Sequence, residues 1–149
     1  MTHVRTQIRE AFAEALETSL PMLEYRVFAS RKYARNLKPG VAIVDMRFLN
    51  VNIEQQTMGV ERSHTGSLYI RVQRDETESE LDNALDADDV AITAAIEAAD
   101  FTALLEEEPE LVQVNFASDA DGAVPIGSII MRYDVEYRIN KTNPESAVR

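Results

Sequence analysis

The sequence contains no cysteine and no tryptophan, and it has only 2 histidines among its 149 residues. The absence of cysteine excludes a disulfide framework, a cysteine-based zinc site and a thiol nucleophile. Long hydrophobic runs are also missing, since no stretch approaches the roughly 20 apolar residues that span a bilayer. Glu10, Glu14 and Glu17 interrupt the apolar residues of the first segment, so we expect no signal peptide there.

The 2 histidines, His3 and His64, carry no recognisable catalytic pattern. One lies near the start of the chain and the other in a polar stretch, and no acid or hydroxyl pattern ties either to a nucleophile. A catalytic triad needs a base that a third group orients. We therefore expect a protein that is not an enzyme, with no catalytic residue, no bound cofactor and no metal site.

Basic residues are absent from one long segment, and this is the most informative feature of the chain. Residues 75–110 hold 14 Asp and Glu and no Lys or Arg, whereas the rest has 12 acidic against 15 basic residues. A folded domain with sorted charge presents two unlike surfaces, which can join copies head to tail or dock a partner on one side. The net charge of −11 argues against a general nucleic-acid binder, which has to neutralise phosphates.

Hydrophobic periodicity predicts helices over residues 4–20 and about 79–99, with a short helical extension over residues 101–108. Apolar or alternating runs predict strands over residues 25–29, 41–49, 68–73, 112–116 and 129–139. We expect one α+β domain over residues 1–139, a mainly antiparallel sheet with two helices packed on one face. Residues of about 50–66 are predicted to form either a strand with a long polar excursion or a mobile loop, and residues 140–149 a flexible tail.

The long acidic helix places Asp82, Asp86 and Asp89 at spacings of three and four, on one face, with Asp88 beside them. Like charges one turn apart repel, so something should offset the repulsion. Solvent alone, a divalent cation and a basic partner are the alternatives. This face is a candidate acidic lumen or interface.

A basic cluster gathers within eight residues, with an aromatic residue among the cations: Arg31, Lys32, Tyr33, Arg35 and Lys38. A phosphate or DNA site, an acid-binding contact on a sister subunit and an ordinary solvated loop are the alternatives, since no glycine-rich cradle or aromatic series is nearby. Arg132 and Arg138 lie on the charged face of the last long strand, toward solvent or a neighbouring subunit. We include both in the candidate interface.

Several segments, in order and spacing over nearly the whole chain, resemble the tail terminator (tail-completion) proteins of long-tailed bacteriophages. The first is Val4-Arg5-Thr6-Gln7-Ile8-Arg9 before an Ala-rich helix, followed by Arg31 and Tyr33 ahead of Val41-Ala42-Ile43-Val44. The next is Leu81-Asp82-Asn83-Ala84-Leu85-Asp86. The last are Pro125-Ile126-Gly127, Met131-Arg132-Tyr133-Asp134-Val135-Glu136-Tyr137-Arg138 and Asn143-Pro144-Glu145. No single motif is diagnostic, because this family has no catalytic signature.

The resemblance implies a small α+β subunit of a hexameric ring in the virion, assembled in the host cytoplasm. Such a ring sits on the head-proximal end of the tail tube, stops tube polymerisation and joins the tail to the neck. Its implied partners are itself, the tail tube protein and a neck or head-completion protein. DNA passes through the lumen without specific binding, and no membrane is involved.

Two other functions stay open at the level of the sequence. Another neck or head–tail connector ring protein shares the size, the acidity and the ring symmetry. A small metal-dependent enzyme or cytosolic ligand-binding domain would use the Asp82, Asp86 and Asp89 cluster. A discrete pocket and metal-dependent stabilisation would favour this last class.

Overall fold

The computed structural model describes residues 3–21, 23–30, 40–54, 61–75, 78–119, 126–140 and 143–148. Helix α1 (Val4–Ser19) forms where the apolar spacing predicts it and buries one stripe, Val4, Ile8, Phe12 and Leu16. His3 caps it, because the Nδ1 atom of His3 accepts the Arg5 N–H at 3.0 Å. Leu20 leaves the helical conformation just before Pro21, as expected for a residue that precedes proline.

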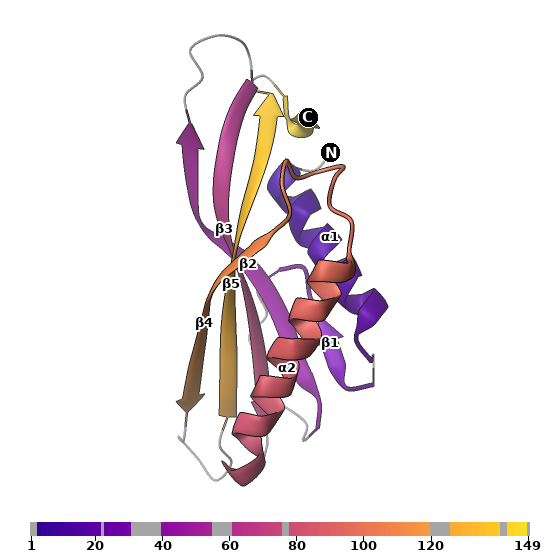
Figure 1. Ribbon diagram of the computed structural model, residues 1–149, viewed down its shortest axis with the longest axis vertical. Helices are drawn as coiled ribbons and strands as arrows, with labels where there is room; N and C mark the ends of the chain where they lie inside the picture. The colour runs from indigo at the N-terminus through magenta and orange to yellow at the C-terminus, as the bar shows by residue number, and fades with distance from the viewer. Residues whose placement is uncertain are drawn as a thin grey trace.

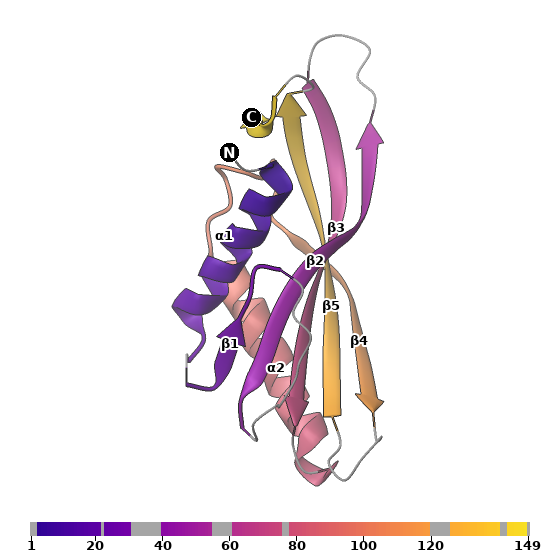
Figure 2. The same cartoon turned by 180° about the vertical axis from the view of Figure 1, so that it is seen from behind.

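Within the described residues, six strands make a single sheet in the order β1-β2-β3-β5-β4, with β6 also paired to β5. Their bounds are β1 (Tyr25–Val27), β2 (Ala42–Glu54), β3 (Glu61–Asp75), β4 (Glu110–Asp119), β5 (Ile126–Asn140) and β6 (Asn143–Val148). Only the β1–β2 pair is parallel among these described strands. Helix α2 (Glu78–Ala98) connects β3 to β4, and both helices lie on the same side of the twisted sheet (Figures 1 and 2). The predicted α+β class is therefore confirmed.

The structure differs from the expected boundaries at three places. Of the two alternatives for residues 50–66, strand is found at both ends of the stretch, since β2 continues to Glu54 and β3 begins at Glu61, and residues 55–60 lie outside the described residues. The predicted flexible tail at 140–149 contains β6, which pairs with the end of β5. Residues 101–108 form one turn, in which the Phe101 carbonyl accepts from the Leu104 and Leu105 amides, and no helix follows.

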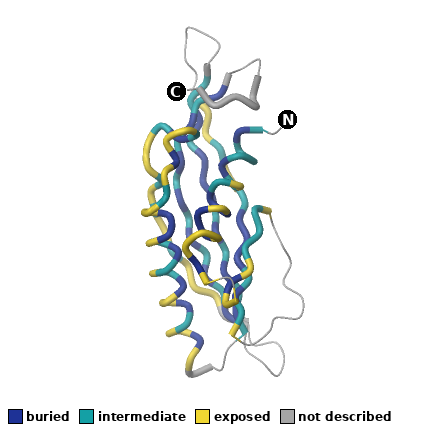
Figure 3. Tube along the Cα trace, turned by 90° about the vertical axis from the view of Figure 1, so that its right-hand side faces the viewer, coloured by how far each residue is buried: buried dark blue, intermediate teal, exposed yellow. Residues whose placement is uncertain are grey.

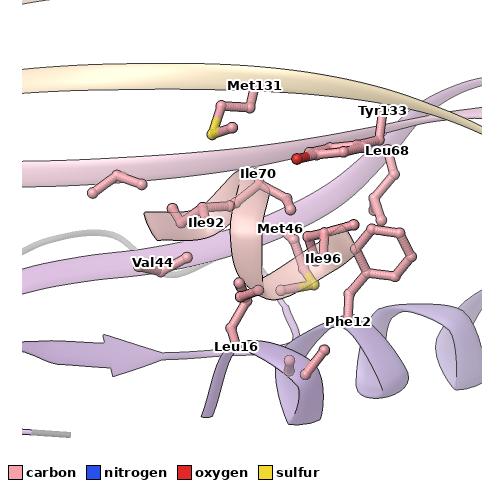
Figure 4. Close-up of a cluster of buried hydrophobic side chains, with 14 of the residues drawn as sticks. Phe12, Leu16, Val44, Met46, Leu68, Ile70, Ile92, Ile96, Met131 and Tyr133 are labelled. Carbon is pink, nitrogen blue, oxygen red and sulfur yellow. The ribbon is translucent and has the colours of Figure 1, made fainter. Parts of the chain in front are cut away.

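The hydrophobic core fills the space between the two helices and the sheet. Alternate residues of β5, from Ile129 to Ile139, are buried, while the residues between them are half-buried (Figure 3). Phe12 stacks on Phe101 with a centroid distance of 4.5 Å and meets the edge of Tyr133 at 6.0 Å. These rings fix the chain after α2 against α1 and β5. Figure 4 shows Phe12 and Tyr133 among the other side chains of the core.

The opposite face of the sheet carries neither α1 nor α2, and we call it the open sheet face. Register places four half-buried arginines on it: Arg47, Arg71, Arg132 and Arg138. Asp45, Asp134 and Glu136 lie among them on the same face. No helix in the described part of the chain is long and apolar enough to cross a membrane.

Candidate functional site

Helix α2 presents an acidic surface on the side of the molecule away from the sheet. Asp82 and Asp86 are exposed there, as are Glu80 and Glu97. Asp89 is only half-buried, and the Thr93 hydroxyl donates to its Oδ1 at 3.3 Å. The predicted acidic face thus exists as a surface, with Asp82 and Asp86 at its centre and Asp89 at its margin.

Asp88, the neighbour of this face, lies inside the protein. Its carboxylate accepts two hydrogen bonds from Arg74, at 2.6 Å from Nε and 2.7 Å from Nη2, and one from the Tyr25 hydroxyl at 2.5 Å. Asp88 is 0% exposed and Arg74 is 8% exposed, so this ion pair is buried. Together the three side chains connect β1, β3 and α2.

The contacts within this buried group keep Tyr25 protonated and Arg74 charged. Burial, followed by the hydrogen bond to Asp88, raises the pKa of Tyr25 to about 12, so its hydroxyl stays protonated as a donor. The hydrogen bonds from Arg74 to the Asp88 carboxylate raise the pKa of Arg74 further above its ordinary range. The spacing of Asp88 is the sequence signal for its burial. Asp88 lies on the same helical stripe as Leu81, Leu85 and Ile92, which face the core.

The aspartates do not assemble a metal centre. Within the described ranges no group of three or more His, Asp or Glu side chains is placed to hold a metal ion. The metal-dependent alternative therefore has no ligand set in these ranges.

The predicted basic cluster of Arg31, Lys32, Tyr33, Arg35 and Lys38 lies outside the described residues. The other two candidate interface residues are described, and both form ion pairs at the open sheet face. The Nε atom of Arg132 lies 3.2 Å from Asp134, and Arg138 pairs with Glu106 from the segment before β4. Their side chains remain 35% and 38% exposed, so both stay accessible to a partner.

A groove of about 710 Å³ opens between the end of α2, the turn that follows it and the start of β4, and we call it the acidic groove. Buried apolar side chains line its inner part: Ile96, Phe101, Leu105 and Tyr133. Six carboxylates line it too: Glu97, Asp100, Glu106, Glu107, Glu108 and Glu110. No Lys or Arg is among the lining residues, and of the six carboxylates Glu106 is paired with Arg138, so the other five make the groove suited to a cationic ligand.

Sequence reasoning missed this groove because its walls come from segments that are distant along the chain. Tyr133 of β5 forms part of the wall next to residues of α2 and of the following turn. The acids at residues 106–110 are the available signal, but the sequence pattern predicts a short helical extension over residues 101–108 and no groove.

His64 is a structural residue in the core side of β3. It is 4% exposed, and its ring lies 5.3 Å from that of Tyr137. Burial, together with the nearby charge of Arg5, lowers the pKa of His64, so the imidazole is neutral at neutral pH. His64 therefore stays neutral in the core, and no nucleophile pattern accompanies it.

Comparison with models of known protein families gave no match, and comparison with curated proteins gave none either.

Proposed function

We propose that this protein is a structural subunit that acts through assembly, and specifically a tail terminator of a long-tailed bacteriophage. In this role a ring of six copies caps the head-proximal end of the tail tube, ends its polymerisation and binds the neck. The sequence resemblance described above supports this assignment. It is a non-catalytic role.

The observation that carries the proposal is the separation of charge between the two sides of the subunit. The side covered by α2 exposes Glu80, Asp82, Asp86 and Glu97 with no basic residue on that helix. The open sheet face on the other side carries four arginines interspersed with Asp45, Asp134 and Glu136, so it has mixed charge and is not acidic like the surface of α2. In a closed ring every subunit turns one side toward the lumen and the opposite side away from it, so two unlike sides suit such an assembly.

The acidic surface also fits the lumen of a ring that DNA must traverse. We infer that Asp82 and Asp86 face the lumen, where negative charge repels the phosphate backbone and lets DNA slide. The open sheet face, with Arg132 and Arg138, then points away from the lumen, where a tube or neck protein can bind it.

Tail tubes polymerised from the tube protein of the same phage or prophage test this proposal. We expect the added protein to form a ring at one end of each tube and to narrow the distribution of tube lengths in negative-stain images. An unrelated acidic protein of similar size and charge is the control. Unchanged tube lengths and bare tube ends would contradict the assignment, and binding to heads alone would favour a neck connector.

Charge reversal tests the assignment of the lumen separately. Phage carrying Asp82→Lys, Asp86→Lys and Asp89→Lys should build normal rings and tails but eject DNA more slowly, because the lumen then attracts phosphate. Tail assembly is scored by microscopy and ejection by the release of DNA. Loss of rings in this variant would place these residues in a subunit interface instead.

A further inference from the structure

The acidic groove has an apolar inner part and an acidic rim, and both suit the side chains of Lys and Arg. Its apolar residues, Ile96, Phe101 and Leu105, are almost completely buried, whereas Glu97, Glu107 and Glu108 are exposed at its rim. Lys and Arg lay their aliphatic stems on apolar surface and keep the charged head near anions or water. A chain segment with several Lys or Arg therefore fits both parts of the groove.

Tyr133 provides a second and independent sign that the groove takes a ligand. It lines the groove, it is 2% exposed, and its hydroxyl interacts with the side chain of Thr93, which also lines the groove. A ligand with a polar group in the groove would find this buried hydroxyl within its wall as a hydrogen-bonding group. Burial raises the pKa of Tyr133 to about 12, the hydrogen bond with Thr93 opposes this rise and the charges of Asp89 and Glu97 add to it, so the hydroxyl stays protonated and can donate.

We propose that the acidic groove is the docking site for residues 31–39 of a second copy of this chain. That segment, RKYARNLKP, has four basic residues, Arg31, Lys32, Arg35 and Lys38, and no acidic residue. It also contains Tyr33 and Leu37, which match the apolar inner part of the groove. Opposite charge on the two partners selects this pairing and orients it.

The inference rests on the proposed ring and states how its subunits join. Each groove receives the basic segment of one neighbour, while the basic segment of the same subunit enters the groove of the other neighbour. Such a head-to-tail contact closes into a ring when the rotation between subunits permits it. The contact explains why acids and bases are sorted along the sequence.

Binding of a fluorescein-labelled peptide of residues 29–41 to the whole protein, followed by fluorescence anisotropy, tests the docking site. We expect binding that weakens at least tenfold when salt rises from about 0.05 M to about 0.5 M, because the contact is ionic. The variant with Glu97→Lys, Glu107→Lys and Glu108→Lys should lose binding at least tenfold. Tyr133→Phe should fold normally and bind about fivefold more weakly, the equivalent of one hydrogen bond.

The matched control reverses three exposed acids of α2 outside the groove, with Glu80→Lys, Asp82→Lys and Asp86→Lys. It changes the net charge by the same amount and should bind the peptide within about twofold of the unmodified protein. Circular dichroism checks that each variant is folded. Equal losses in the two triple variants, or no peptide binding by the unmodified protein, would overturn the docking site.

A charge-swap mixture then tests the contact between whole subunits. One variant carries the reversed groove, and the other carries Arg31→Glu, Lys32→Glu and Arg35→Glu. Each variant alone should fail to assemble, because its groove and its segment 31–39 then carry the same charge. The mixture should assemble as a ring in which the two variants alternate, because every groove then meets a segment of opposite charge. Rings formed by the groove variant alone would refute this contact and leave the tail-terminator role standing. Peptide binding without any ring at tube ends would refute that role and leave the docking site standing.

Discussion

The buried pair of Arg74 and Asp88 offers the sharpest prediction about stability. Asp88→Asn keeps the shape of the side chain but removes the negative charge that compensates the guanidinium. Arg74 is then left buried without its counter-ion, and removal of one partner from such a pair typically costs about 3–5 kcal/mol. For a domain of this size that loss lowers Tm by about 10 °C.

Thermal and urea unfolding followed by circular dichroism measure the effect. Asp86→Asn is the matched control, because Asp86 lies two residues away on α2 and is exposed. We expect this control to stay within about 0.5 kcal/mol of the unmodified protein. The double variant Arg74→Met with Asp88→Leu should be more stable than either single variant, since replacement of both charges removes the uncompensated group.

Two outcomes would refute this reasoning. An Asp88→Asn protein as stable as the Asp86→Asn control would show that the pair does not hold α2 against β3. A double variant whose loss equals the sum of the single losses would show that Arg74 and Asp88 are not coupled.

Further predictions concern acidity, packing and the groove rim. The folded protein depresses the pKa of His64, so the unfolded chain binds the proton first as pH falls below about 6.5, and stability should decrease from pH 7.5 to 5.5. His64→Gln should weaken this dependence in urea titrations, and an identical pH profile would contradict the assignment. Gly127→Ala should cost about 1–3 kcal/mol in thermal unfolding, because its Cβ would lie 2.8 Å from Leu81 Cγ. Leu81→Ala in the same chain should recover part of this overpacking loss, and strictly additive losses would argue against it. Glu106→Gln should cost at most about 1 kcal/mol, because its pair with Arg138 is partly exposed; a larger loss would show that this pair fixes the segment before β4.

Periodicity predicted the parts of the fold that are amphipathic. The stripe of α1 and the alternation of β5 each bury one side only, so the sequence pattern records the burial directly. The ends of β2 and β3 were missed because residues 50–54 and 61–66 are mostly polar. Their strand structure comes from backbone pairing between β2, β3 and β5, which leaves little trace in hydrophobicity.

The sequence was sufficient to predict where acidic residues gather, but not which of them are buried or which segments meet to form the groove. The excess of acids after residue 75 correctly indicated an acidic surface on α2, with Asp82 and Asp86 exposed. The burial of Asp88 was missed because its partners, Arg74 and Tyr25, are 14 and 63 residues away. The acidic groove depends on Tyr133 meeting the end of α2, a contact that local patterns do not encode.

The central claim is that copies of this protein assemble into a ring. The mass of the protein in solution and its state at the ends of tail tubes test this claim most directly. Light scattering on a sizing column, at low and moderate salt, gives the mass in solution, and negative-stain averages of tube ends give the assembled state. The account predicts a six-subunit ring, free or at the tube end, that becomes less stable as salt screens the ionic contacts. A monomer in solution together with bare tube ends would contradict it.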